Sequence, residues 1–326
     1  MGDYEFMEQQ FKTIKNTLRS GYHVGTKVTG DGLTLTEAIR GETGRVELEG
    51  DIGHSDFVNI TFRKEYDNPV VVTYIITRSG GTQSIESRVT DVTSTGCKIF
   101  MEQPNNKIHN KEYIGYIVLE VGAHITEHGY RMEAGLHETE NARRPKQTDF
   151  VGDEIKFSKI YKSTPIVLHS LNTYNNKTFA TTMISEVTVD GFTVAQEFAE
   201  TKKTSSKEKI GWIAFEPMIG KGYITDVRGE VGKITPTNDT GVDDKPATLI
   251  EFNTVFSNRP DVIVKGQTMN DNDGYWSRGA GAWSKELIRV YAEEDQRTDI
   301  ERHHPSETFG YAAFDGNSLI KTLKQS

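Results

Sequence analysis

Short apolar runs that each follow a proline recur along this chain. Residues 70–76, 166–171 and 262–264 are rich in β-branched side chains, and a proline stands one or two residues before each run. Proline is tolerated there because it cannot donate a hydrogen bond to a sheet. The pairs Thr95-Gly96 and Asp190-Gly191 are turn dipeptides between apolar segments, as in hairpins. The pattern predicts short antiparallel strands, and it does not indicate long helices in these regions.

The same landmarks recur three times at a nearly constant period. A phenylalanine that opens the first landmark recurs every 95 residues (157−62 and 252−157), at Phe62, Phe157 and Phe252. A second landmark, a glycine followed by an aromatic residue, lies in 114–117, 210–213 and 309–312, at intervals of 96 and 99 residues. Such a period predicts three copies of one unit. Short strands and polar loops that repeat within about 70 residues are typical of a small antiparallel sandwich.

The period also divides the chain. A first segment covers 1–45, and three β-sandwich repeats follow at 46–140, 141–235 and 236–326. Gly129-Tyr130 and Gly222-Tyr223 begin similar stretches between the repeats, which predicts a hairpin or arm that leads into the next sandwich. Residues 141–145 and 235–241 have the composition of exposed turns. The glycine of the last landmark is expected to let a neighbouring backbone or aromatic ring approach closely.

The first 45 residues lie outside the repeats. Their apolar residues fall three or four positions apart, on one side of a predicted helix, at Tyr4, Met7, Phe11, Ile14 and Leu18. Gly21 would end this helix. The helix either docks on its own first sandwich or packs its apolar face against identical chains or a larger assembly. A segment that caps a repeat array is expected to differ from the repeats.

Charge and composition limit the partners. The 326 residues carry 38 Lys and Arg against 47 Asp and Glu, a net charge of −9, and no basic cluster marks a face for a phosphate backbone. We therefore expect no nucleic-acid partner. The single cysteine, Cys97, excludes an intrachain disulfide and fits a reducing compartment. No apolar run approaches 18 residues and no secretion signal opens the chain, so we expect synthesis in a cytoplasm without membrane insertion.

The second repeat carries the landmarks most completely. It has an aromatic-x3-aromatic pair, a proline before a β-branched run, Val-Thr-Val-Asp-Gly-Phe-Thr-Val at 187–194 and Ile-Gly-Trp-Ile-Ala at 210–214. This order resembles the H-type lectin domain. The resemblance implies an all-β fold of three tandem six-stranded antiparallel β-sandwich modules behind an N-terminal helical segment. It also implies a family that commonly trimerises and binds sugar in grooves between protomers.

The resemblance implies a candidate sugar site in two repeats. The family builds this site from an acidic residue, an arginine two positions later and a histidine just before the final strand. By position these are Glu86, Arg88 and His109 in the first repeat, and Trp276, Arg278 and His304 in the third. The second repeat departs from the pattern, with Met183 and Ser205. Arginine and carboxylate suit vicinal hydroxyls because bidentate hydrogen bonds fix their orientation; alternatively, both arginines form surface or interface salt bridges.

No motif for catalysis, cofactor binding or metal binding stands out, so we expect no enzyme. His303 and His304 are adjacent, and their rings would face apart on a strand. Residues 270–274 are expected to form a polar turn, because Met269 stands where the first carboxylate of a calcium loop should be.

Similar sandwiches look to be used as tandem modules in tail and adhesion proteins of bacterial viruses. We therefore expect a structural and interaction protein of a virion, a tail, fibre or collar component made in the host cytoplasm. Its expected partners are other virion proteins and further copies of the chain. The alternative is a carbohydrate-binding adhesin that recognises host-surface glycans. The two functions are compatible, since a tail component can also be the part that touches a cell.

Overall fold

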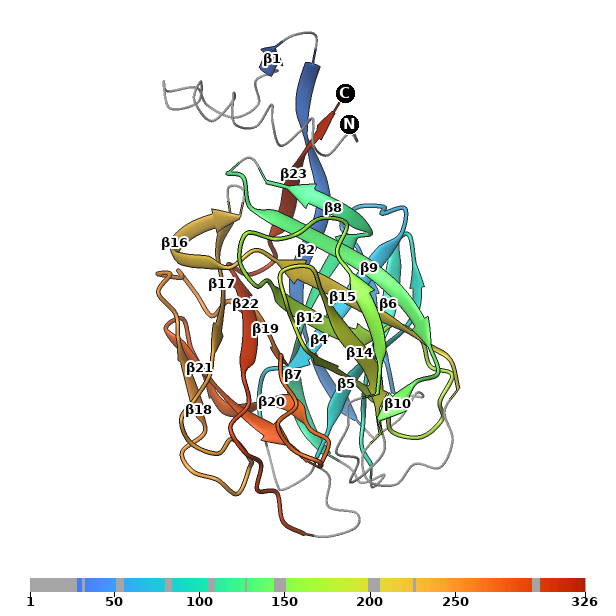
Figure 1. Cartoon of the computed structure of the whole chain (residues 1–326), viewed down its shortest axis with the longest axis vertical. Coiled ribbons are helices and arrows are strands. Elements are labelled where there is room, and N and C mark those ends of the chain that lie inside the picture. Colours follow the sequence, from blue (N-terminus) through green and yellow to red (C-terminus); the bar gives the residue numbers. More distant parts are fainter. Residues whose placement is uncertain are drawn as a thin grey trace.

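The computed structural model describes residues 28–30, 33–50, 56–79, 84–104, 109–126, 128–143, 151–198, 206–224, 227–294 and 300–325. The helix expected over Tyr4–Leu18 lies outside these residues. The described residues form strands, turns and loops only, so the predicted all-β class is confirmed (Figure 1). Since they contain no helix, none of them forms a helix that could span a bilayer.

The first strand group pairs in two antiparallel sheets. Its strands are β2 (Leu33–Gly50), β3 (Val58–Thr61), β4 (Pro69–Ile75), β5 (Glu86–Thr93), β6 (Gly96–Glu102) and β7 (His109–Glu120). The sheets have the orders β2-β7-β4 and β3-β6-β5. β1 (Val28–Gly30) pairs with the beginning of β2 and extends the first order to β1-β2-β7-β4.

The same pairing returns twice more. The second group contains β9 (Arg131–Thr139), β11 (Asp153–Lys156), β12 (Ile166–Leu171), β13 (Thr181–Ser185), β14 (Gly191–Glu197) and β15 (Glu208–Phe215). They pair as β9-β15-β12 and β11-β14-β13, and β10 (Ala142–Arg143) adds a short parallel contact to β14. The third group contains β17 (Val227–Ile234), β18 (Thr248–Glu251), β19 (Asp261–Gly266), β20 (Trp276–Trp283), β21 (Leu287–Glu293) and β22 (Phe309–Phe314). They pair as β17-β22-β19 and β18-β21-β20.

An arm strand follows the last strand of each group and pairs with the first strand of the next. β8 (Gly122–Ile125) forms a hairpin with β9, and β16 (Met218–Ile224) forms one with β17. These are the arms that the sequence predicts. After the third group, β23 (Leu319–Gln325) pairs with β2 of the first group. β23 therefore closes a ring, and the three arm strands lie toward one end of the molecule (Figure 1).

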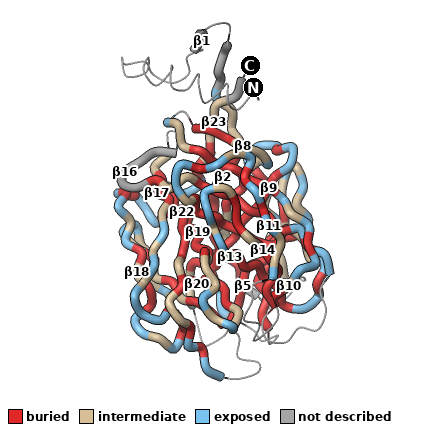
Figure 2. The backbone as a smooth tube through the Cα atoms, viewed as in Figure 1, coloured by how far each residue is buried: buried red, intermediate tan, exposed pale blue. Residues whose placement is uncertain are grey.

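β4, β12 and β19 meet at the centre of the molecule, where buried residues concentrate (Figure 2). The sequence of β4 does not alternate between apolar and polar residues, because both faces of this strand are buried. Val70, Val72 and Tyr74 pack in a cluster shared with the other two groups, while Val71 and Ile75 pack in a core of the first group alone. A strand that is buried on both faces is apolar throughout. The β-branched runs after the prolines are these central strands.

The glycines of the last landmark lie where two groups meet. A Cβ atom at each would collide with an atom of another group: Gly115 with Val262 O at 2.5 Å, Gly211 with Val70 Cγ1 at 2.8 Å, and Gly310 with Ile166 Cγ2 at 2.7 Å. The predicted approach of a neighbouring backbone is confirmed at Gly115, whereas at Gly211 and Gly310 an aliphatic side chain of another group approaches instead. The contacts run from the first group to the third, the second to the first and the third to the second. This cyclic order recurs in strand packing, because β4 contacts β12 and β15, β12 contacts β19 and β22, and β19 contacts β4 and β7.

Candidate functional site

Three seams separate the strand groups: the first seam lies between groups one and two, the second between two and three, and the third between three and one. A buried glutamate from the last strand of a group, or just before it, lies at each seam. These glutamates are Glu112, Glu208 and Glu307, at most 1% exposed. Each accepts hydrogen bonds from a threonine hydroxyl and a backbone N–H that follow the central strand of its group. The donors are Thr77 and Ser79, Thr173 and Asn175, and Thr268 and Asn270, respectively.

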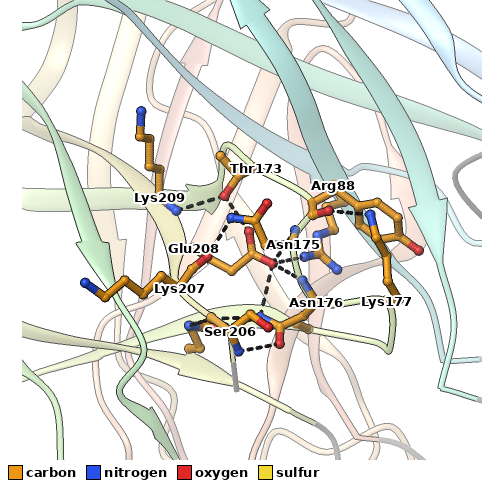
Figure 3. Close-up of polar contacts among 12 residues, drawn as sticks. Arg88, Thr173, Asn175, Asn176, Lys177, Ser206, Lys207, Glu208 and Lys209 are labelled. Carbon is orange, nitrogen blue, oxygen red and sulfur yellow. Dashed lines mark hydrogen bonds and ion pairs between the residues drawn. The ribbon is translucent and has the colours of Figure 1, made fainter. Parts of the chain in front are cut away.

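At the first seam, one arginine joins two groups. Arg88 of β5 is 1% exposed, and its Nη1 and Nη2 each lie 2.7 Å from a carboxylate oxygen, of Glu102 and Glu208. Figure 3 shows Arg88 beside the carboxylate of Glu208. The guanidinium also lies 4.6 Å from the centre of the Tyr174 ring, a cation–π contact. Burial raises the pKa of Glu102, and the charge and hydrogen bond of Arg88 oppose that rise.

The third seam repeats this arrangement. Arg278 of β20 is 1% exposed and lies 3.2 Å from Glu293 in its own group and 3.0 Å from Glu112 in the first group. Arg88 and Arg278 therefore form the interface ion pairs of the alternative interpretation above. A sugar that used the same guanidinium groups would have to break these pairs. Sugar binding by the two arginines stays a prediction.

The other residues of the predicted sugar site are also enclosed where the structure describes them. Glu86 is 3% exposed and pairs with Lys265 of the third group at 3.2 Å. Trp276 donates from Nε1 to the Ile85 carbonyl at 2.9 Å. His304 lies buried between Glu294 and Glu307. His109 begins β7, and its side chain lies outside the description. The described residues thus belong to seams and show no common open pocket.

The second seam has no arginine at the position of Arg88 and Arg278, and an arginine from another strand lies there instead. Met183 of β13 stands where Arg88 and Arg278 stand, and Glu197 ends the neighbouring β14. Arg143 of β10 reaches this position from a different strand: Nη1 lies 3.5 Å from Glu197, and Nε donates to Met269 Sδ at 3.1 Å. Arg143 is 1% exposed. The expectation of an exposed turn over 141–145 is therefore wrong at this residue, because the seam contains an acid that needs a cation.

An open groove of about 590 Å³ lies beside the first seam. The first group contributes residues 67–69 and 90–94, and the second contributes Leu136, 172–175, Lys177 and Lys209. The Tyr174 ring packs edge-on against Phe100 at 5.1 Å, and Lys177 Nζ lies 4.0 Å from the ring centre. The groove therefore combines carboxylates, amides, ammonium groups and a fixed aromatic ring. Such convergent polar groups beside an apolar wall are typical of ligand sites.

A smaller hollow lies at the second seam, among His169, Met183 and Lys265. Its volume of about 10 Å³ is near the minimum for one water molecule. Among the described residues, no three His, Cys, Asp or Glu side chains are grouped as a metal site requires. Comparison of the chain with known protein families, curated proteins and solved structures found no match.

The glutamates at the seams were not predicted from the sequence, although their spacing repeats with the period of the landmarks. Glu112, Glu208 and Glu307 each stand two residues before the glycine-aromatic landmark, so they share its spacing. A second acid recurs at Glu102, Glu197 and Glu293, spaced by 95 and 96 residues (197−102 and 293−197). Charged residues that recur with the period of a buried landmark indicate a buried pair. Arg143 gave no such signal, because it has no counterpart in the period.

Proposed function

We propose that this chain is a structural and interaction protein of a virion, a tail, fibre or collar component. Its body would consist of three six-stranded H-type lectin-like β-sandwich modules over 46–140, 141–235 and 236–326. The segment 1–45 would join it to the assembly. The observation that carries this proposal is the cyclic order of the seams. A ring of three modules in one chain is a preassembled block with a fixed register, which suits a building part.

The seams support this assembly role over a role in chemistry. At the first and third seams, buried arginine and glutamate side chains form ion pairs that cross between two groups. Buried polar pairs of this kind favour one register of packing over others. The three arm strands lie toward one end, and β1 and the beginning of β2 lie there as well (Figure 1). We infer that the chain attaches through this end.

Light scattering on the purified full chain tests the assembly role. We expect a mass above the 36.6 kDa of one chain, and substitution of Phe11→Glu together with Leu18→Glu should return the mass to that of a monomer. A wild-type chain that stays monomeric at high concentration would contradict assembly through the first segment. Peptides of this chain in the mass spectrum of purified particles would support the virion location, and their absence would count against it.

A second candidate function, glycan recognition by an adhesin, is favoured by the groove at the first seam. The six residues predicted from the family pattern would then frame the seams, while Tyr174, Asn175 and Lys209 would meet the sugar. Hydrogen bonds to a charged group are worth about 1.5–3 kcal/mol, so Lys209→Ala should weaken binding by about tenfold or more. Lys207, which lines none of the groove, provides the matched control Lys207→Ala.

A glycan array with these variants separates the two candidate sites. Loss of binding in Lys209→Ala but not in Lys207→Ala supports the groove. Loss in Arg88→Ala and Arg278→Ala with retained folding, and no effect of Lys209→Ala, supports the family pattern instead. Absence of binding by the wild-type chain rejects the adhesin and leaves the assembly role.

A further inference from the structure

His304 lies in a buried position between two carboxylates. Its Nδ1 contacts Glu294, and its Nε2 lies 3.2 Å from Glu307 Oε1. His304 is 1% exposed, and its ring lies tilted against the Tyr275 ring, with 4.6 Å between the ring centres. A neutral imidazole donates one hydrogen bond, while an imidazolium donates two. Two carboxylate acceptors therefore call for the protonated ring.

The segment that carries His304, residues 300–308, is tied to the loop at 240–244. The backbone N–H of His304 donates to Asp244 at 3.0 Å, and its carbonyl accepts from Thr240 at 2.7 Å. His303 on the other side of the chain is exposed and also pairs with Asp244, at 2.7 Å. The predicted strand is not found at these two residues, and the histidines differ in burial: the His303 side chain is 64% exposed. Only the ring of His304 is buried.

Further acidic groups lie near the two carboxylates that contact this histidine, while the nearby cation Arg302 pairs with Asp243 and Glu293. Asp273 and Glu301 lie near Glu294 and raise the pKa of its carboxyl group, although burial raises it more. The Tyr275 hydroxyl faces Glu307, and across the seam Glu197 lies against Gly274. This excess of acids favours a proton at the centre.

The second seam differs in this respect from the other two. The carboxylates of Glu208 and Glu112 are neutralised by arginine, whose charge does not titrate in the ordinary pH range. Glu307 has a histidine instead. Glu307 also accepts from the Asn270 backbone N–H at 2.6 Å. The next residue back, Met269, contacts Arg143 of the second group. Loss of the His304 proton would therefore change contacts that reach the second seam.

We propose that His304, with Glu294 and Glu307, forms a pH-sensitive clasp that holds residues 300–308 closed while the imidazole is protonated. The clasp opens when the imidazole loses its proton, and the arginine-bound first and third seams stay closed. The protein thereby has a pH-sensitive contact beside the second seam, where the first and third seams have an arginine.

The pKa values of His304 and Glu294 together determine whether the clasp becomes more or less stable as the pH rises. Burial by itself would lower the pKa of His304, but the hydrogen bonds and charges of Glu294 and Glu307 outweigh it and raise the pKa to about 9. Burial raises the pKa of Glu294 to about 7. Both values exceed those of the open chain, so the closed clasp binds more protons and its stability falls as pH rises. The His304 contribution is complete below the ordinary pKa of about 6.5 and is lost through about pH 9.

Hydrogen exchange of the full chain tests the clasp. Between pH 7 and 9, after correction for intrinsic rates, the opening equilibrium of residues 300–308 should rise by about tenfold per pH unit, the slope of one proton. Amides of β15 at the first seam should show no such slope. The slope should vanish in His304→Gln and persist in His303→Asn. A flat wild-type profile, or a slope retained in His304→Gln, would overturn the proposal.

A second measurement keeps the test sharp if His304→Gln does not fold. Titration of the His304 ring in the wild-type chain by NMR should give a pKa above 8. A pKa at or below 6.5 would show that the carboxylates do not hold the proton and would overturn the clasp. In Glu294→Gln the same titration should move toward 6.5, because one of the two charges that favour the imidazolium is gone.

Discussion

Arg88→Met is the substitution that probes the seams most sharply, because the chain itself places Met183 at the equivalent position of the second group. The variant removes a guanidinium that is 1% exposed and lies 2.7 Å from each of two carboxylates. Loss of one partner from a buried ion pair costs about 3–5 kcal/mol, since a charge is left buried without compensation. Loss of the contact with the Tyr174 ring adds about 1 kcal/mol.

The remaining contacts of the carboxylates set the expected value within this range. Glu208 keeps the backbone N–H groups of Asn175 and Asn176, at 2.9 and 2.6 Å, and Glu102 keeps that of Ala180 at 3.3 Å. These donors partly compensate the charges. We therefore expect a loss of about 3 kcal/mol in the free energy of unfolding, near the lower end of the range.

Urea denaturation followed by circular dichroism measures this loss, with the exposed Lys207→Met as the matched control. The control should change the free energy of unfolding by less than about 0.5 kcal/mol. A double-mutant cycle with Glu208→Gln should give a coupling energy of about 1–3 kcal/mol, because the two side chains share one ion pair. A loss below about 1 kcal/mol in Arg88→Met, or simple additivity in the cycle, would refute the role of the pair at this seam.

Two further substitutions test the other seam contacts. Gly310→Ala should lower stability by about 1–3 kcal/mol, because its Cβ would lie 2.7 Å from Ile166 of the second group; an unchanged melting temperature would contradict this close packing. Arg143→Met should destabilise the chain by about 3 kcal/mol because it removes a buried guanidinium that lies 3.5 Å from the buried carboxylate of Glu197. Met183→Arg in that background should recover part of the loss in the same urea assay, and no recovery would mean that the two arginine positions are not interchangeable.

The strands were accessible from sequence because their causes are local. The period of Phe62, Phe157 and Phe252 and the β-branched runs after prolines report burial at fixed spacing along the chain. The arms were visible as well, from the stretches that begin at Gly129 and Gly222. Even the lone Cys97 follows the period: it pairs with Ile60 as Phe192 pairs with Ile155.

The seams were not accessible in the same way. Arg88 and Glu208 are 120 residues apart, and Glu86 and Lys265 are 179 residues apart. The period along the chain marks the recurring acids, but which cation each acid meets depends on how whole strand groups pack. For this reason the pattern Glu86, Arg88 could suggest an open sugar site, while the side chains lie in enclosed ion pairs. The groove beside Tyr174 arises from two groups and has no motif of its own.

Closure of the ring by β23 is the central claim, and a disulfide tests it most directly. Ala38 of β2 and Thr322 of β23 are register partners across antiparallel strands, where Cα atoms lie about 4.5–5.5 Å apart and a disulfide can form. With Cys97→Ser as background, Ala38→Cys with Thr322→Cys should oxidise to an intramolecular disulfide in a single chain. Free thiols under oxidising conditions in the folded chain, or disulfides only between chains, would contradict the ring.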